Sequence, residues 1–96
     1  MTILMSDIQF TALSELPILE KNSEKRDWVI ALQHILNGCG YSVRIDGSFG
    51  QKTLDAVNTF QQDLNLDSVG VTLGIVETKT WQAFENHRKI GGWRSM

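Results

Sequence analysis

The chain has 96 residues, with 9 lysines and arginines against 11 aspartates and glutamates and a formal charge of −2. Its 42% of apolar and 21% of charged residues are typical of one globular domain and exclude a disordered or low-complexity chain. The near-neutral balance argues against duplex nucleic acid as a partner, and so short a chain has room for one modest core, not for the long cleft of a large enzyme.

The N-terminal residues 1–22 have the least regular pattern, and we expect an arm or a short helix there. Some of its apolar residues can cover part of the core, namely Ile8, Leu13 and Leu16. The first residues lack the basic start, apolar stretch and cleavage site of a signal peptide. No segment approaches the ~20 apolar residues of a membrane helix, so we expect no membrane span.

A first helix is predicted over residues 24–38. Its apolar residues form one stripe, flanked by Val29, that consists of Trp28, Leu32, Ile35 and Leu36. Asn22 or Ser23 can cap the start of this helix, and Gly38 and Gly40 can end it.

Residues 41–45 alternate like a strand and precede the turn pair Asp46-Gly47, a combination that ordinarily predicts a hairpin. A helical pattern follows directly instead, so we expect a loop and then a second helix that ends near residue 64 or 65. Two start signals compete for this helix. They are a capping box of Ser48 with Gln51, and a hydrophobic staple of Phe49 with Leu54 around Gly50.

The C-terminal part contains an uncharged loop, after Asp67, within residues 66–76 and a last helix over residues 77–87 that buries Trp81 and Phe84. We therefore expect an N-terminal arm (1–22), one domain (23–87) and a flexible C-terminal tail (88–96). Trp28 is also expected to be buried, whereas Trp93 in the tail needs a partner or a fold-back.

The two halves of the chain repeat each other. Gln33 lies 14 positions before a glycine and Gln61 lies 13 positions before one, and in both halves a threonine follows that glycine by 6 positions. The matched pairs are Gln33 and Gln61, Gly47 and Gly74, Phe49 and Val76, Thr53 and Thr80, Leu54 and Trp81. This repeat predicts an all-α fold, a small three-helix bundle with an internal pseudo-twofold repeat and structured loops, in which the middle helix is shared.

These residues resemble the peptidoglycan-binding domain 1 family. The resemblance rests on Asp46-Gly47-x-Phe49-Gly50-x-x-Thr53-x-x-Ala56-Val57-x-x-Phe60-Gln61, on Val29-x-x-Leu32-Gln33, on Gly40-Tyr41, on Thr80-Trp81 and on the lead-in Leu16-Pro17-x-Leu19. It covers about residues 16–85. It implies a non-catalytic three-helix module, bacterial or from a phage, that holds cell-wall hydrolases on peptidoglycan.

The second loop departs from the family pattern. Where the family usually carries Asp-Gly-x-Val-Gly, this chain has Leu73-Gly74-Ile75-Val76-Glu77. The first loop keeps the whole pattern, so we place ligand binding near residues 41–49.

Most corner residues are expected to have a structural role. Glycine supplies a positive φ, Phe49 fills the core, and the two glutamines satisfy backbone groups of the loops, although they can instead present amides to a sugar or a peptide. The structural set is Gln33, Gly47, Phe49, Gly50, Thr53, Gln61, Gly74, Thr80 and Trp81.

Catalytic and metal sites are not expected. His34 and His87 have no metal-ligand spacing, and Cys39 is the single cysteine. His34 and Cys39 are five residues apart, and on a helix this spacing points the two side chains about 140° away from each other. They therefore do not form a catalytic dyad. The aspartates form no recognisable pair for glycoside hydrolysis. We expect no cofactor.

The predicted function is non-catalytic binding of peptidoglycan or muropeptides that tethers an associated activity to the bacterial wall, in the periplasm or envelope. Tyr41 can pack on a sugar or peptide, and Arg44 can pair with a stem-peptide carboxylate or a diaminopimelate acid group. The full set of candidate ligand residues is Tyr41, Arg44, Asp46, Ser48 and Gln62. The alternative is a protein-interaction module that docks on a cell-wall hydrolase or a secretion component through residues 68–76 and Trp93.

Overall fold

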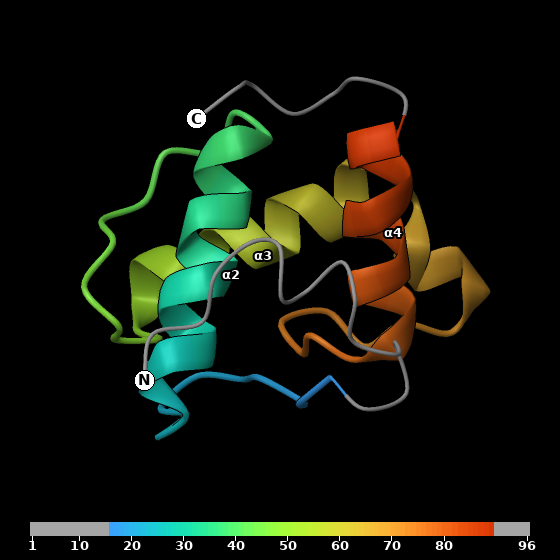
Figure 1. The fold of residues 1–96 in the computed structure, drawn as a ribbon. Helices are drawn as coiled ribbons and strands as arrows, with labels where there is room; N and C mark the ends of the chain where they lie inside the picture. The colour runs from blue at the N-terminus through green and yellow to red at the C-terminus, as the bar shows by residue number, and fades with distance from the viewer. Residues whose placement is uncertain (1–15, 90–96) are drawn as a thin grey trace.

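The computed structural model describes residues 16–89, and this part of the chain is helical. Its elements are α2 (Arg26–Gly38), α3 (Gln51–Asp63), the short 3-10 helix η2 (Leu66–Val69) and α4 (Thr78–Lys89). In Figure 1, α2 and α4 stand next to each other and α3 crosses behind them. The all-α, three-helix prediction is confirmed. Ile8, Leu13 and Trp93 lie outside the described residues.

The first helix begins two residues later than predicted. Its N-cap is Lys25, which makes no side-chain cap bond, and Asn22 lies in the left-handed region with a φ of 70°. Ser23 Oγ accepts a hydrogen bond from the Lys25 N–H at 3.3 Å, so it binds the backbone of the N-cap residue and not an N–H group of the helix itself. Neither residue is therefore the N-cap that the sequence predicted.

The second helix begins where the hydrophobic staple predicts, because its N-cap is Gly50. The competing capping box, with Ser48 as N-cap, is wrong. Ser48 is engaged elsewhere, since its N–H donates to Asp46 Oδ1 at 2.9 Å and its carbonyl accepts from Gln33 Nε2 at 3.0 Å. Its backbone belongs to the loop, and the helix starts only after it.

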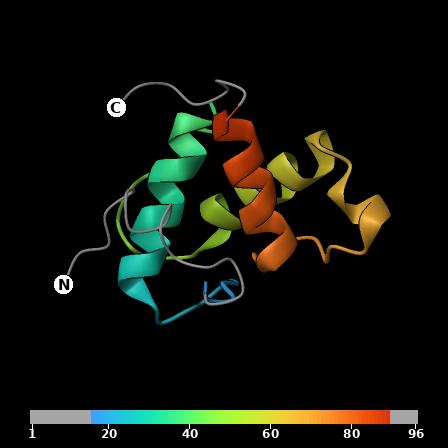
Figure 2. The same cartoon turned by 45° about the vertical axis from the view of Figure 1, so that its right-hand side comes forward.

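The segment between α3 and α4 is more ordered than an irregular loop. Asn65 has a φ of 56° and turns the chain out of α3, and Ser68 Oγ donates to the Asn65 carbonyl at 2.6 Å. The result is the 3-10 helix η2, where the sequence predicted only a loop. Figure 2 shows this segment at the edge of the molecule, beyond α3 and α4.

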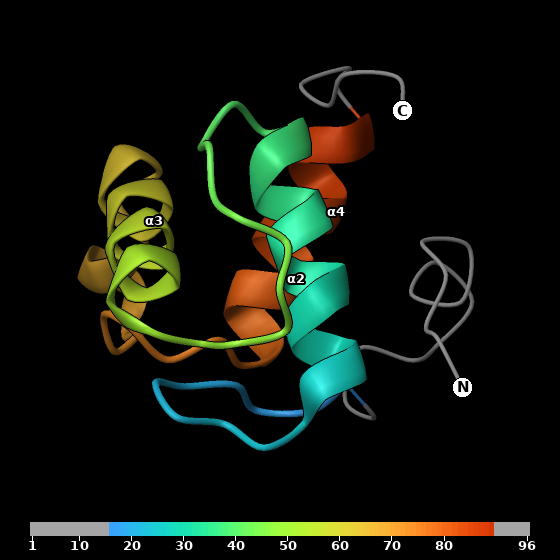
Figure 3. The same ribbon diagram turned by 90° about the vertical axis from the view of Figure 1, so that its left-hand side faces the viewer.

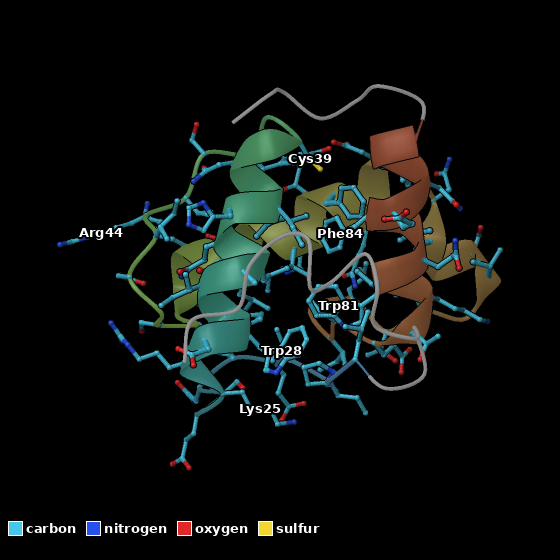
Figure 4. All side chains as sticks on the ribbon, viewed as in Figure 1. Lys25, Trp28, Cys39, Arg44, Trp81 and Phe84 are labelled. Carbon is cyan, nitrogen blue, oxygen red and sulfur yellow. The ribbon has the colours of Figure 1, made fainter. Side chains whose placement is uncertain are left out.

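The core is aromatic at its centre. Phe60 of α3 stacks on Phe84 of α4 with ring centroids 4.3 Å apart, and Trp81 lies edge-on to Trp28 of α2 at 6.2 Å. Trp81 and Phe84 are buried as predicted, but Trp28 is only partly buried. Figure 4 shows Trp28, Trp81 and Phe84 between α2 and α4. The half-buried Cys39 packs against this core.

The lead-in to α2 forms part of the folded domain. Leu16 and Leu19, which the sequence analysis placed in an arm, are buried. Leu19 exchanges two backbone hydrogen bonds with Val76, of 2.9 and 2.8 Å, and Asn22 N–H donates to the Phe49 carbonyl at 2.8 Å. Val76 and Phe49 are matched positions of the repeat, so residues 19–22 join the two corners.

Candidate functional site

The first corner, which we define as residues 41–53, is organised by one buried side chain, Gln33 of α2. Its Oε1 accepts hydrogen bonds from the N–H groups of Asp46 and Gly47, at 3.0 and 2.9 Å. Its Nε2 lies 3.0 Å from the Ser48 carbonyl and 3.1 Å from both Thr53 Oγ1 and Asp46 Oδ1. Figure 3 shows the loop of this corner running from the end of α2 to the start of α3.

The second corner, residues 69–80, has the same arrangement around Gln61 of α3. Its Oε1 accepts from the Gly74 N–H at 2.8 Å, and its Nε2 donates to the Ile75 carbonyl at 2.9 Å and to Thr80 Oγ1 at 3.1 Å. Gly47 and Gly74 both lie in the left-handed region, with φ of 78° and 86°. The repeat in the sequence is therefore a repeat of hydrogen bonds.

The two corners differ in what they expose. Asp46 Oδ1 accepts from the Ser48 N–H and from Gln33 Nε2, and these hydrogen bonds lower the pKa of the Asp46 carboxyl below its ordinary value. The matching residue of the second corner is Leu73, whose side chain is 38% exposed. The first corner thus carries a fixed carboxylate, and the second carries an apolar side chain in its place.

A pocket of about 260 Å³ lies against the first corner and the start of α3. We call it the corner pocket. It brings together three of the five candidate ligand residues with three polar residues of α3, and its polar lining consists of Arg44, Asp46, Ser48, Gln51, Lys52 and Thr53. Arg44 extends from the loop away from the helices (Figure 4). Asp46 Oδ1 is already hydrogen-bonded within the corner, and Arg44 and Lys52 are the two cations among the residues that line this pocket.

A second pocket, of about 300 Å³, adjoins the first and shares Lys52 with it. We call it the helix pocket, and it is lined by Tyr41, Ser42, Lys52, Asp55, Ala56 and Thr59. The Tyr41 O–H donates to Asp63 Oδ2 at 2.5 Å, and its ring lies edge-on to Phe60 at 5.9 Å. Burial and the Asp63 carboxylate raise the pKa of Tyr41 to about 12.

Gln62, the fifth candidate, is exposed on α3 and lines neither of these two pockets. Lys52, Asp55 and Thr59 were not predicted as ligand residues, although they follow one another at helical spacing on the polar side of α3. That spacing was the available signal.

No helix within residues 16–89 is both long and apolar enough to cross a bilayer. In the same residues, His, Cys, Asp and Glu side chains form no group of three that could hold a metal ion. A family model described as "Putative peptidoglycan binding domain" matches residues 25–84. The match runs from the start of α2 to Phe84 of α4 and includes both corners.

Proposed function

Because the chain belongs to this family of peptidoglycan binding domains, we propose that it is a non-catalytic module that binds the bacterial cell wall at its first corner and tethers an associated activity there. The observation that carries the proposal is the corner pocket. Its cationic side chains, Arg44 and Lys52, stand beside the corner that keeps the whole family pattern.

The chemistry of the corner pocket suits a stem peptide, which carries carboxylates and amides. The Arg44 guanidinium can pair with a carboxylate, and the Ser48 hydroxyl can exchange hydrogen bonds with an amide. Asp46 fixes the wall of the pocket, and the Tyr41 ring offers a flat apolar surface to a sugar or a peptide next to it.

The carboxylates of the two pockets are poorly suited to hydrolysis. A glycosidase needs one carboxylic acid with a raised pKa and a second carboxylate across the scissile bond. Hydrogen bonds lower the pKa of Asp46, and Asp55 Oδ1 accepts a hydrogen bond from Gln51 Nε2 at 2.8 Å. These contacts hold both carboxylates in place, which supports a role in binding.

Small, shallow pockets suit a tether. At about 260 and 300 Å³ they lie at or below the lower end of typical small-molecule sites, which span ~300–1,000 Å³. Each can take about one amino acid or one sugar, and modest affinity suffices because the wall is a polymer that presents many copies of the ligand.

The test is a pull-down with purified, protein-free sacculi at low and moderate salt. The native protein is expected in the pellet, and Arg44→Gln should lower the bound fraction and its dependence on salt. Lys79→Gln is the matched control, because Lys79 is an exposed cation on α4 at the second corner. A native protein that stays in the supernatant at both salt concentrations would refute the proposed function.

A second candidate function is docking on a hydrolase or a secretion component. It is supported by two apolar side chains at the second corner, Val69 and Leu73, which are 57% and 38% exposed. This function would be favoured if a partner co-purifies with the native protein and not with the double variant Val69→Ser/Leu73→Ser, while the native protein does not bind sacculi. A protein that binds sacculi and stays monomeric without a partner would contradict it.

A further inference from the structure

The helix pocket contains two opposite charges on one helix face. Lys52 and Asp55 are three positions apart on α3, a spacing that places the Cβ atoms of two residues about 5–6 Å apart. Side chains of opposite charge at this spacing commonly pair with each other. Here both line one pocket of about 300 Å³.

The Lys52 ammonium and the Asp55 carboxylate do not pair with each other. Asp55 Oδ1 accepts a hydrogen bond from Gln51 Nε2 at 2.8 Å, and Gln51 Oε1 in turn accepts from Lys21 Nζ at 3.1 Å. This chain of contacts orients the carboxylate from outside the pocket. Within residues 16–89, the Lys52 ammonium has no hydrogen-bond or ion-pair partner.

Two other residues that line the pocket, Tyr41 and Thr59, are also held by hydrogen bonds. Tyr41 is held through its O–H by Asp63 and through its ring by Phe60. Thr59 Oγ1 donates to the Asp55 carbonyl at 2.9 Å, and Ala56, four positions after Lys52 on α3, adds a small apolar surface to the pocket. The Asp55 carboxylate and the Tyr41 ring are therefore preorganised, and the Lys52 ammonium in the same pocket is free to pair with a ligand.

We propose that the helix pocket binds a zwitterionic amino-acid centre, one carbon that bears both an ammonium and a carboxylate group. The ligand carboxylate pairs with the Lys52 ammonium, and the ligand ammonium pairs with the Asp55 carboxylate. A ligand with only one of these groups leaves either Lys52 or Asp55 without its partner, so the pocket discriminates by charge.

In peptidoglycan such a centre is the free end of a diaminopimelate side chain, so this inference rests on the proposed function and narrows its ligand. A lysine-type stem peptide lacks the carboxylate at that end. Amidation of diaminopimelate removes the negative charge, and cross-linking through its amine removes the positive one. The pocket should therefore prefer stem peptides that are diaminopimelate-type, not amidated and not cross-linked.

The test is a calorimetric and chemical-shift titration of the whole chain with soluble tripeptide stem peptides. The probes are the free diaminopimelate peptide, the same peptide amidated at the side-chain carboxylate, and the same peptide acetylated at the side-chain amine. Each modification is expected to weaken binding about two- to fivefold, the range of one exposed charge pair. The amide shifts of Lys52 and Asp55 should follow the titration of the free peptide.

Two variants assign each charge to its partner. Lys52→Gln should weaken binding of the free peptide by the same factor and leave the amidated peptide unchanged, and Asp55→Asn should do the same with the acetylated peptide. Lys79→Gln and Asp67→Asn are the matched controls, exposed on α4 and η2, and should change neither affinity.

The outcomes separate this inference from the proposed function. Sacculi and all peptides bound without any effect of amidation or acetylation would overturn the zwitterion pocket alone. No binding of peptides or sacculi by the native protein would overturn both. Equal losses for the modified and unmodified peptides in Lys52→Gln would also overturn the pairing, because the side chain would then act without contacting the ligand carboxylate.

Discussion

Replacing Gln33 with methionine tests whether one buried amide holds the first corner together. Methionine has a similar length and no polar group, so the core keeps its volume while the hydrogen bonds are lost. The substitution leaves the N–H groups of Asp46 and Gly47 without their partner, and the Ser48 carbonyl keeps only the 3.5 Å hydrogen bond from Thr53 Oγ1. Gly47 is buried, whereas the Asp46 and Ser48 groups are nearer the surface.

A buried polar group without a partner costs about 1–3 kcal/mol, and one that can reach water costs less. Two orphaned N–H groups, one of them buried, therefore predict a loss of about 2–4 kcal/mol. This is a large share of the ~5–15 kcal/mol that stabilises a typical domain. Gln61→Met orphans one N–H, that of Gly74, together with the Ile75 carbonyl, so we expect a smaller loss of about 1–3 kcal/mol.

The assay is urea unfolding followed by circular dichroism, with Gln62→Met as the control. Gln62 is the exposed neighbour of Gln61 on α3, and its substitution should change the free energy of unfolding by less than about 0.5 kcal/mol. If the free energy of unfolding falls with urea concentration at the same slope in the variant and the native protein, the substitution has changed stability alone. A loss below about 1 kcal/mol in Gln33→Met, or equal effects of the Gln33 and Gln62 substitutions, would refute the reasoning.

Three further predictions follow from single residues. Leu19→Ala should cost about 2–5 kcal/mol in the same assay because Leu19 is fully buried, whereas Ile18→Ala, at a side chain that is 56% exposed, should cost little. Tyr41 is the single tyrosine, so the absorbance of its phenolate should titrate near its pKa of about 12, and Asp63→Asn should lower this pKa. Because the pKa in the folded chain exceeds the ordinary 10.0, the stability that Tyr41 contributes is complete below pH 10.0 and is lost as the pH rises through about 12. Burial raises the pKa of Cys39 from 9.0 to about 11, so near neutral pH its thiolate fraction should be about a hundredfold lower in the folded chain than in urea. The rate of Cys39 alkylation should fall by the same factor, and equal alkylation rates in the folded and the urea-unfolded chain would contradict this.

The sequence predicted the parts of the fold that depend on local spacing. Gln33 and Gln61 stand at matched distances from a glycine and a threonine, and the structure shows matching hydrogen bonds at both corners. A glutamine on one helix can reach a loop 13 to 14 residues later only if the chain turns sharply at a residue that tolerates positive φ, so spacing and residue type together indicate the geometry.

The candidate site was less accessible to sequence reasoning because it depends on contacts between distant residues. Tyr41 and Asp63 are 22 positions apart, and their hydrogen bond fixes the path of the loop across α3. That path brings Tyr41 and Ser42 beside α3, so that the exposed residues Lys52 and Asp55 line a pocket. Gln62, expected on the same helix as an exposed side chain that can hydrogen-bond an amide, is exposed but lies outside both pockets.

The pairing of Leu19 with Val76 bears on the order in which the chain folds. The corner hydrogen bonds join residues 13 to 20 positions apart, whereas Leu19 and Val76 are 57 positions apart. Closing a loop about four times longer costs roughly 1 kcal/mol more in chain entropy, so the corners should form first and the lead-in should dock last. In native-state hydrogen exchange, the amide of Asn22 should therefore open at lower free energy than those of Gly47 and Gly74. Residues 19–22, which we expect to dock last, are therefore the segment that joins the two corners by hydrogen bonds.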